Sequence, residues 1–133
     1  MSMDRQFRCT PTSVPQARRF VVETLFDLPD ASLEVVALMV SELATNCVLY
    51  AMTDFDVSIE RTDDHIHIAV IDTGAGEPEI RWPSTSEPHG RGLHIVEELS
   101  DDWGVTPSTE HAGKTVWFTL ALSAHPNDLT NTR

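Results

Sequence analysis

Residues 31–51, ASLEVVALMVSELATNCVLYA, decide the fold more than any other stretch of the chain. Apolar side chains recur here every three or four residues in one continuous stripe, which indicates a long helix with one buried face. Asp30, directly after Pro29, is suited to cap the first turn. The sequence therefore predicts a helix over residues 31–51, give or take one turn. The stripe consists of Leu33, Val36, Ala37, Val40, Leu43, Ala44, Cys47, Val48 and Ala51.

The segments next to this helix show strand and helix patterns in turn. After it, residues 55–60 and 66–70 alternate apolar and polar side chains around a polar turn, which predicts a β-hairpin. Before it, Ser13-Val-Pro-Gln16 has the form of a capping box, so a helix is predicted from there to about Leu28. Residues 6–10 are predicted to form an edge strand.

The remaining part of the chain combines a long aperiodic segment with one helix and two strands. Asp72-Thr-Gly-Ala-Gly76 opens a stretch without periodicity that reaches Gly90 and contains three prolines. A helix is then predicted over residues 92–100, and strands over 103–105 and 115–122. The order strand-helix-helix-strand-strand-loop-helix-strand-strand predicts an α/β fold of two layers, with a mixed, mostly antiparallel sheet and three helices on one face.

Length and composition limit the classes of function. The 133 residues fit a single domain, with a core over about residues 6–122 and a flexible tail over 123–133. Nine basic against 21 acidic side chains give a formal charge of −12, which argues against direct nucleic-acid binding. No apolar run approaches the length of a membrane span and no signal peptide is visible, so we expect a soluble, cytoplasmic protein without membrane contact. Cys9 and Cys47 lie far apart without a CxxC pattern, which disfavours a zinc site or a disulfide.

Two positions combine polar chemistry with a defined geometry. Glu42 and Asn46 lie four residues apart on the predicted helix, so their side chains stack on one face, with Tyr50 one turn further. Asp72 ends an apolar run and is followed closely by glycines, which would place a carboxylate at the rim of the sheet. Each has an ordinary alternative, a solvated helix flank for the pair and a turn for Asp72, and taken alone these alternatives are more frequent.

Gly90-Arg91-Gly92-Leu93 is a third candidate, at the start of a predicted helix. A glycine turn that opens a helix presents free backbone N–H groups to an anion, and Arg91 adds a charge that can bind a phosphate. A plain helix start is the alternative. Gly113-Lys114-Thr115 has the ending of a Walker A loop, but Ser108 stands where that motif needs its first glycine.

Taken together, the segments 42–46, 72–76, 90–93 and 113–115 resemble, in order and spacing, the four boxes of the GHKL ATP-binding superfamily. This superfamily includes gyrase, heat-shock chaperones, histidine kinases and mismatch-repair ATPases. More narrowly, the chain resembles the single-domain anti-sigma serine kinases of bacterial partner switching. The resemblance spans about residues 13–122 and implies a Bergerat-type ATP-binding fold with ATP and Mg²⁺ as cofactors.

The resemblance implies a role for each box at the adenine and the phosphates. Asp72 matches the aspartate that accepts a hydrogen bond from the exocyclic amine of adenine, and Thr115 matches the threonine that supports the same edge. Glycines at 74 and 76 would let the backbone pass close to the nucleotide. The lid of the family corresponds to residues 77–89. The full set of implied cofactor-binding residues is Asn46, Asp72, Gly74, Gly76, Gly90, Arg91, Gly92, Leu93 and Thr115.

The same resemblance implies the metal ligand and the catalytic residue. Asn46 matches the ligand of Mg²⁺, a hard oxygen donor. Glu42 matches the carboxylate that acts as a general base or orients the attacking group near the γ-phosphate. The phosphoryl acceptor would be a serine of a partner protein, because the chain has no separate helical domain for a phospho-accepting histidine.

The function implied is that of an anti-sigma factor with kinase activity. Such a protein holds a sigma factor inactive until a STAS-type anti-anti-sigma protein engages it, and phosphorylates a serine of that protein to reset the switch; relatives act as homodimers. Leu49 and Tyr50 stand where relatives often carry a basic residue and a histidine. They keep open a second hypothesis, a nucleotide-binding module that regulates a partner without phosphotransfer. An ATPase that drives conformational change is a weaker third, because the chain has no room for a transducer domain.

Overall fold

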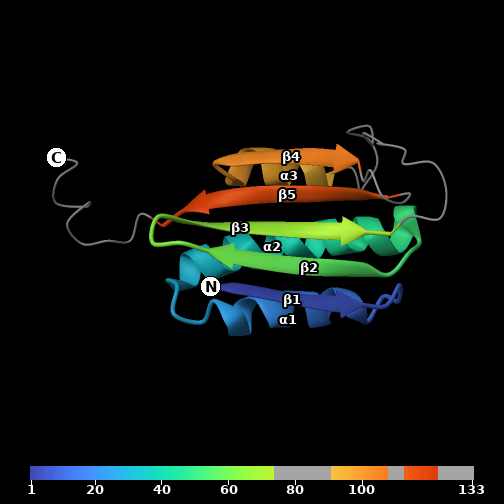
Figure 1. Cartoon of the computed structure of the whole chain (residues 1–133), viewed down its shortest axis with the longest axis horizontal. Coiled ribbons are helices and arrows are strands. Elements are labelled where there is room, and N and C mark those ends of the chain that lie inside the picture. Colours follow the sequence, from blue (N-terminus) through green and yellow to red (C-terminus); the bar gives the residue numbers. More distant parts are fainter. Residues whose placement is uncertain (74–90, 108–112, 123–133) are drawn as a thin grey trace, which may run out of the picture.

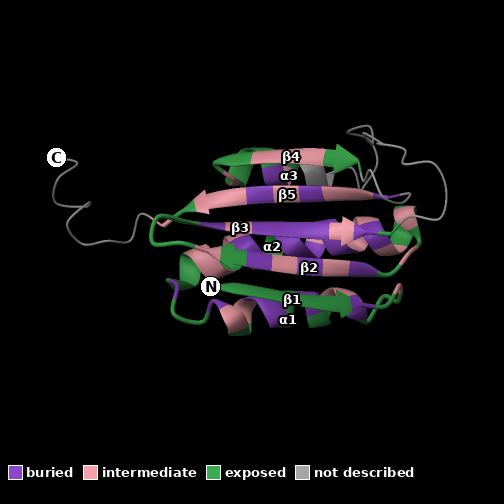
Figure 2. Cartoon of the chain, viewed as in Figure 1, coloured by how far each residue is buried: buried purple, intermediate pink, exposed green. Residues whose placement is uncertain are grey.

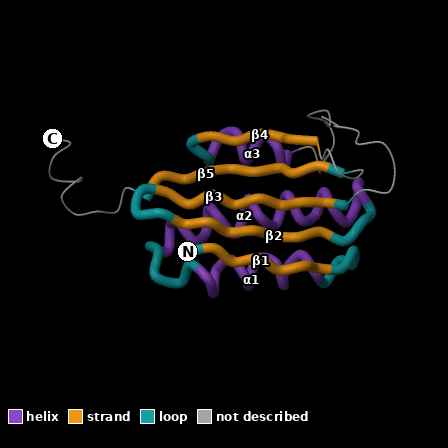
Figure 3. Tube along the Cα trace, viewed as in Figure 1, coloured by secondary structure: helices purple, strands orange, loops and turns teal. Residues whose placement is uncertain are grey.

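The protein is a two-layer α/β fold, seen here in a computed structural model that describes residues 1–73, 91–107 and 113–122, and only the backbone of 91–93. One five-stranded sheet forms the first layer, and the helices lie behind it on one face (Figure 1, Figure 3). The elements are β1 (Ser2–Phe7), α1 (Ser13–Thr24), α2 (Asp30–Asn46), the π-helix η1 (Cys47–Ala51), β2 (Phe55–Arg61), β3 (His65–Asp72), α3 (Arg91–Leu99), β4 (Asp102–Pro107) and β5 (Lys114–Ala121).

The sheet has the strand order β1-β2-β3-β5-β4, and the four pairings within it are antiparallel. Two hairpins, β2–β3 and β4–β5, supply four of the strands, and α1 and α2 connect β1 to its neighbour β2. Between β3 and β4 the chain passes through α3, so β5 comes to lie beside β3. The predicted fold class and the predicted order of elements are confirmed.

The core lies between the sheet and the helices. Figure 2 shows β3 mostly buried in the middle of the sheet and β1 mostly exposed at its edge. Three phenylalanines join the layers at one side: the ring of Phe7 stacks on Phe55 at 5.5 Å and meets the edge of Phe20 at 6.0 Å. Each fully buried side chain of this size contributes about 1.5–3 kcal/mol. Phe7 is therefore the residue that anchors the edge strand in the core, while the whole strand pairs with β2.

Helix α2 forms the centre of the helical layer, where it packs against both α1 and α3. With η1 it spans 22 residues, Asp30–Ala51, and is long and apolar enough by length and composition to cross a membrane. The sequence prediction overlooked this run. The apolar stripe of α2 is buried against the sheet and the neighbouring helices, which is the ordinary place of a core helix.

Several predicted element boundaries are wrong at the N-terminal side. The edge strand runs over Ser2–Phe7 instead of starting at Gln6. The prediction missed its first residues because they are exposed and, apart from Met3, polar, so they give no apolar alternation. Helix α1 ends at Thr24, before the predicted Leu28. Leu25 and Leu28 are buried from the turn that follows, so their apolar side chains imitate a further helical turn. Pro29 also disfavours helical geometry at the residue before it.

The predicted helix caps are also wrong. The N-cap of α1 is Thr12 and makes no side-chain cap hydrogen bond. Ser13 lies inside the first turn, and its hydroxyl meets that of Thr10 at 3.2 Å instead of a backbone N–H. At α2 the N-cap is Pro29, whose carbonyl oxygen accepts from the N–H of Leu33 at 3.0 Å. Asp30 is the first helical residue, where its charge still favours the positive end of the helix dipole.

Candidate functional site

Asp72 is the buried carboxylate of the site. It is the last residue of β3 and is only 3% exposed. The antiparallel register places Ile71 opposite Thr115, so Asp72 lies against the first residue of β5, Lys114. The backbone N–H of Lys114 donates to Oδ1 of Asp72 at 3.2 Å, and its Nζ donates to Oδ2 at 2.9 Å. A nearly buried carboxylate is thus held by two donors of one neighbouring residue.

Gly113 makes this close approach of β3 and β5 possible. Its φ of +132° is a conformation that side chains disfavour, and a Cβ there would collide with the backbone oxygen of Asp72. The same virtual Cβ would lie 3.0 Å from the carbonyl carbon of Thr73. The glycine of the box 113–115 is therefore required by the backbone, and it lets Lys114 lie against Asp72.

Glu42 and Asn46 lie on the last turns of α2, beside its buried stripe. Both side chains are half-buried, whereas Leu43 and Ala44 between them are buried. The spacing of four residues puts both polar groups on one flank of the helix, as predicted. Their position on α2 brings them toward the end of the molecule at which β3 ends (Figure 1).

The π-helix η1 follows Asn46 directly and corrects the prediction of a regular helix to residue 51. Its bond from the N–H of Met52 to the carbonyl of Cys47, at 2.7 Å, spans five residues instead of four. Met52 takes the left-handed conformation at φ 56°, and Thr53 has a buried hydroxyl oxygen without a hydrogen-bond partner among the described residues. Single π-turns of this kind occur frequently at functional sites.

The first residue of η1, Cys47, lies within the electrostatic influence of Asp72. Cys47 is buried, and this burial, followed by the nearby charge of Asp72, raises the pKa of its thiol above the usual range. The thiol is therefore a neutral neighbour of the carboxylate. The charges of Asp72 and Lys114 act on this thiol in opposite senses, since the first raises its pKa and the second lowers it.

The structure brings some of the predicted site residues together and leaves others outside its description. Asp72 and Thr115 lie on adjacent strands, at the end of the molecule where α2 also ends (Figure 1). Helix α3 begins at Arg91, with Gly92 and Leu93 in its first turn, and it packs against α2. The glycines at 74, 76 and 90, and the predicted lid over 77–89, lie outside the described residues.

Lys114 is the residue that the sequence analysis missed. It is the one lysine of the sequence and occupies the middle of the box Gly113-Lys114-Thr115. Its place directly before the predicted adenine-supporting Thr115 was the available signal. The ion pair itself could not be foreseen, because it depends on the register between β3 and β5.

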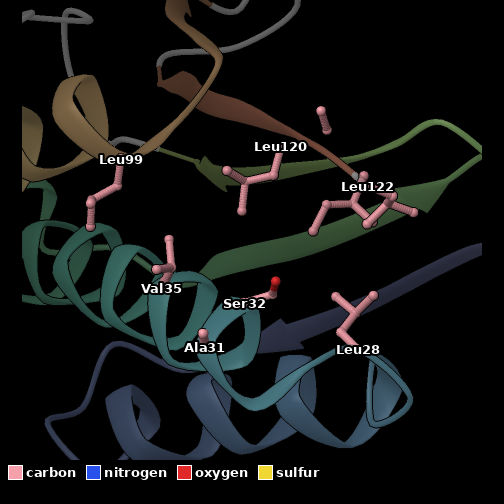
Figure 4. A pocket seen from close by; sticks show the side chains of 9 residues that line it. Leu28, Ala31, Ser32, Val35, Leu99, Leu120 and Leu122 are labelled. Carbon is pink, nitrogen blue, oxygen red and sulfur yellow. The ribbon is translucent and has the colours of Figure 1, made fainter. Parts of the chain in front are cut away.

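A recess with apolar walls lies apart from this site. It measures about 230 Å³ and opens between the N-terminal part of α2 and the far ends of α3 and β5 (Figure 4). Four of its nine lining residues are leucines, and Ser32 also lines it. None of the predicted site residues lines this recess.

Comparisons with known proteins agree with the fold and the boxes. A family model described as the histidine kinase-like ATPase domain matches residues 7–120. The chain therefore belongs to this family, a class of ATPase domain, and the resemblance drawn from the four boxes is confirmed at the level of the family.

One solved structure shows the same fold over nearly the whole chain. The RsbU and RsbW domains of Rv1364c from Mycobacterium tuberculosis match with a TM-score of 0.71 and 19% identity, over 92% of this chain and 32% of that chain. This chain thus spans about a third of the length of the solved one. No curated protein sequence matches the chain.

Proposed function

We propose that the chain binds Mg-ATP at the end of the sheet where β3, β5 and the C-terminal end of α2 meet. Asp72 is the observation that carries this proposal: a nearly buried carboxylate at a strand end, next to the strand that carries Thr115, in a member of an ATPase family. A buried carboxylate needs hydrogen-bond donors, and the exocyclic amine of adenine is such a donor. Gly113 fits the same assignment, because it keeps the strand ends close together without a side chain.

The phosphates and the metal would lie toward α2. The amide oxygen of Asn46 is a hard donor of the type that Mg²⁺ prefers, and the half-buried position leaves it accessible. Mg²⁺, when bound, neutralises charge on the phosphates. Arg91 begins α3, where free backbone N–H groups favour an anion. The proposed site thus draws on four elements, of which β3 pairs with β5 and α2 packs against α3.

Glu42 would be the catalytic residue of a serine/threonine kinase. Its carboxylate would take the proton of a serine hydroxyl on the partner, while the serine oxygen forms its bond to the γ-phosphorus and the bond to the ADP oxygen breaks. The products are ADP and a phosphoserine. The position of Glu42, one helical turn before Asn46, supports this role, since it lies on the same flank as the proposed metal ligand.

The regulatory role is that of an anti-sigma factor in the cytoplasm. A fold shared with a solved RsbW domain and the resemblance to anti-sigma serine kinases support it. The partners would be a sigma factor and a STAS-domain anti-anti-sigma protein, with the chain acting as a homodimer and without direct contact to nucleic acid or membrane. The formal charge of −12 suits a basic partner surface better than a phosphate backbone.

Calorimetric titration with Mg-ATP tests the binding site. We expect saturable binding by the wild type, and its loss in Asp72→Asn and in Asn46→Ala. Asp27→Asn is the matched control, because Asp27 is an exposed aspartate with an arginine partner and belongs to no proposed site. An Asp72→Asn variant that binds as tightly as the wild type would contradict the assignment of the base site.

The kinase step needs its own measurement, with the Glu42→Ala variant and a STAS-domain protein as acceptor. We expect binding of Mg-ATP to persist and transfer of the γ-phosphate to stop. The second candidate, a binding module without phosphotransfer, is favoured by Leu49, which is 45% exposed on η1 where a cation could otherwise reach the phosphates. Binding by the wild type without any transfer would support this second candidate.

A further inference from the structure

Lys114 is hydrogen-bonded to Asp72, the carboxylate that the proposed function assigns to binding of the adenine base. Both oxygens of Asp72 have a donor from this one residue, the backbone N–H on Oδ1 and the ammonium on Oδ2. The two donors differ in what they can do. The N–H belongs to the strand β5 and is fixed by the register, whereas the ammonium ends a flexible four-carbon chain.

Access to Asp72 passes by this ammonium. The side chain of Asp72 is 4% exposed and that of Lys114 is 23% exposed. Solvent therefore reaches the lysine and hardly reaches the carboxylate behind it. A ligand group that is to bond with Oδ2 competes with the ammonium already bound there.

We propose that Lys114 is a latch on the base site. In the free protein its ammonium holds Oδ2 of Asp72, and an aminopurine binds by replacing the ammonium with its own exocyclic N–H. The backbone N–H on Oδ1 stays in place during this exchange. The inference rests on the proposed function, because it takes Asp72 as the residue that binds the base.

The latch lowers the affinity for nucleotide. It also makes the affinity depend on whether the base has an N–H donor that can replace the ammonium. Breaking a charge-assisted hydrogen bond at a buried carboxylate has a free-energy cost that the incoming N–H must offset. A base edge without an N–H donor cannot offset it. Lys114 is thus a specificity-determining residue for the same site.

Variants of Lys114 test the latch by calorimetric titration with Mg-ATP. Lys114→Met keeps an unbranched side chain only one atom shorter and removes the ammonium, so we expect binding about tenfold tighter than in the wild type. Lys114→Arg keeps a cation on Asp72 and should bind no more tightly than the wild type. Arg61→Met is the matched control: it breaks the ion pair of Arg61 with Asp27, at the other end of the β2–β3 hairpin, and should leave the affinity unchanged.

The wild type itself offers a second measurement, which needs no variant to fold. Because Lys114 is the one lysine of the sequence, protein labelled with ¹³C,¹⁵N-lysine gives a single side-chain ammonium signal in NMR spectra. In the free protein this signal should be that of an ordered, hydrogen-bonded ammonium. Saturating Mg-ATP should convert it to that of a mobile side chain whose protons exchange rapidly with water.

The outcomes separate the latch from the proposed function. Tighter binding by Lys114→Met, together with a released ammonium in the wild type, supports the latch. Binding by the wild type with equal or weaker binding by Lys114→Met, or an ammonium signal that stays ordered under saturation, overturns the latch and leaves the base site standing. Absence of binding in both the wild type and Lys114→Met overturns the proposed function, and the latch with it.

Discussion

Two ion pairs of similar length lie at opposite ends of the central hairpin and differ in almost everything else. Lys114 Nζ and Asp72 Oδ2 are 2.9 Å apart, and Arg61 NH1 and Asp27 Oδ1 are 2.8 Å apart. The side chain of Asp72 is 4% exposed, whereas that of Asp27 is 50% exposed. Water screens the second pair and hardly reaches the first, so distance alone is a poor guide to what a charge pair does.

The geometry around the two pairs differs as well. Arg61 binds Asp27 through two parallel N–H donors, each at 2.8 Å, from a surface where either partner can also bond with water. Lys114 binds Asp72 from a backbone position that Gly113 dictates. The exposed pair is a surface contact between a strand and a turn, and the buried pair is part of how two strands are held in register.

The largest expected effect follows from Gly113→Ala. The added Cβ would collide with the backbone at Asp72 and would sit at a φ of +132°, so the strand ends must separate. We expect a loss of about 3 kcal/mol in the free energy of unfolding, measured by chemical denaturation. Gly104→Ala is the control. Its Cβ would meet the ring of Trp117 instead of backbone, and Gly104 lacks a positive φ, so a loss as large as that of Gly113→Ala would contradict this explanation.

Lys114→Met should have the next largest effect on stability. The variant leaves Oδ2 of Asp72 buried without its ammonium, so we expect a loss of about 2 kcal/mol in the free energy of unfolding. A double-mutant cycle with Asp72→Asn measures the coupling between the two side chains. If the losses of the two single variants add up to the loss of the double variant, the coupling energy of the pair is zero. The contrast with the exposed pair would then be wrong.

Arg61→Met should change stability at neutral pH much less than Lys114→Met. The hydrogen bond from Arg61 lowers the pKa of Asp27 below its ordinary value of 3.8, so the pair stabilises the fold only while Asp27 is ionised. This small stabilisation is present above pH 4 and is lost as the pH falls through the lowered pKa. Urea denaturation of wild type and variant between pH 2 and pH 7 checks this sign. A difference that grows toward acid pH would contradict it.

Asp56 adds a third carboxylate to the comparison of the two ion pairs, because its charged neighbour is another acid, Asp4. The variant that tests it is Asp56→Asn. Burial, and secondly the charge of Asp4, raise the pKa of Asp56, so its ionisation opposes folding. The variant should therefore be slightly more stable than the wild type above the raised pKa. The gain should disappear as the pH falls through this pKa, where the wild type is already protonated. Thermal unfolding at pH 7 and pH 3 measures it, and Asp63→Asn in the exposed turn is the control.

The elements with strong periodicity could be predicted from the sequence. The stripe of residues 31–51 and the alternation around the 61–64 turn gave the central helix and the hairpin, because these segments are buried on one face. β1 was displaced by several residues, since only Phe7 of that strand is buried. The π-helix left no trace in the pattern, because its apolar residues continue the spacing of the α-helix.

The sequence predicted those residues of the site that have a known role in one of the four motifs. The motif order selected Asp72 and Thr115, and the register places them on adjacent strands, with Thr115 opposite Ile71, the residue before Asp72. Lys114 was not selected, because a lysine before the threonine has no fixed role in the pattern. Its role depends on a side-chain contact across two strands, and such contacts are not encoded in spacing along one segment.

The π-helix η1 affects how the chain can change in length. Removing one residue from an ordinary helix turns every later side chain by about 100°, which ruins a buried stripe. At η1 the turn already contains one residue more than an α-helix needs, and the three residues that follow form a short connection to β2. A deletion of Leu49 would let the turn close as a regular helix while β2 keeps its place. This point in the middle of the protein is therefore one where natural or engineered sequences can lose a residue without losing the sheet.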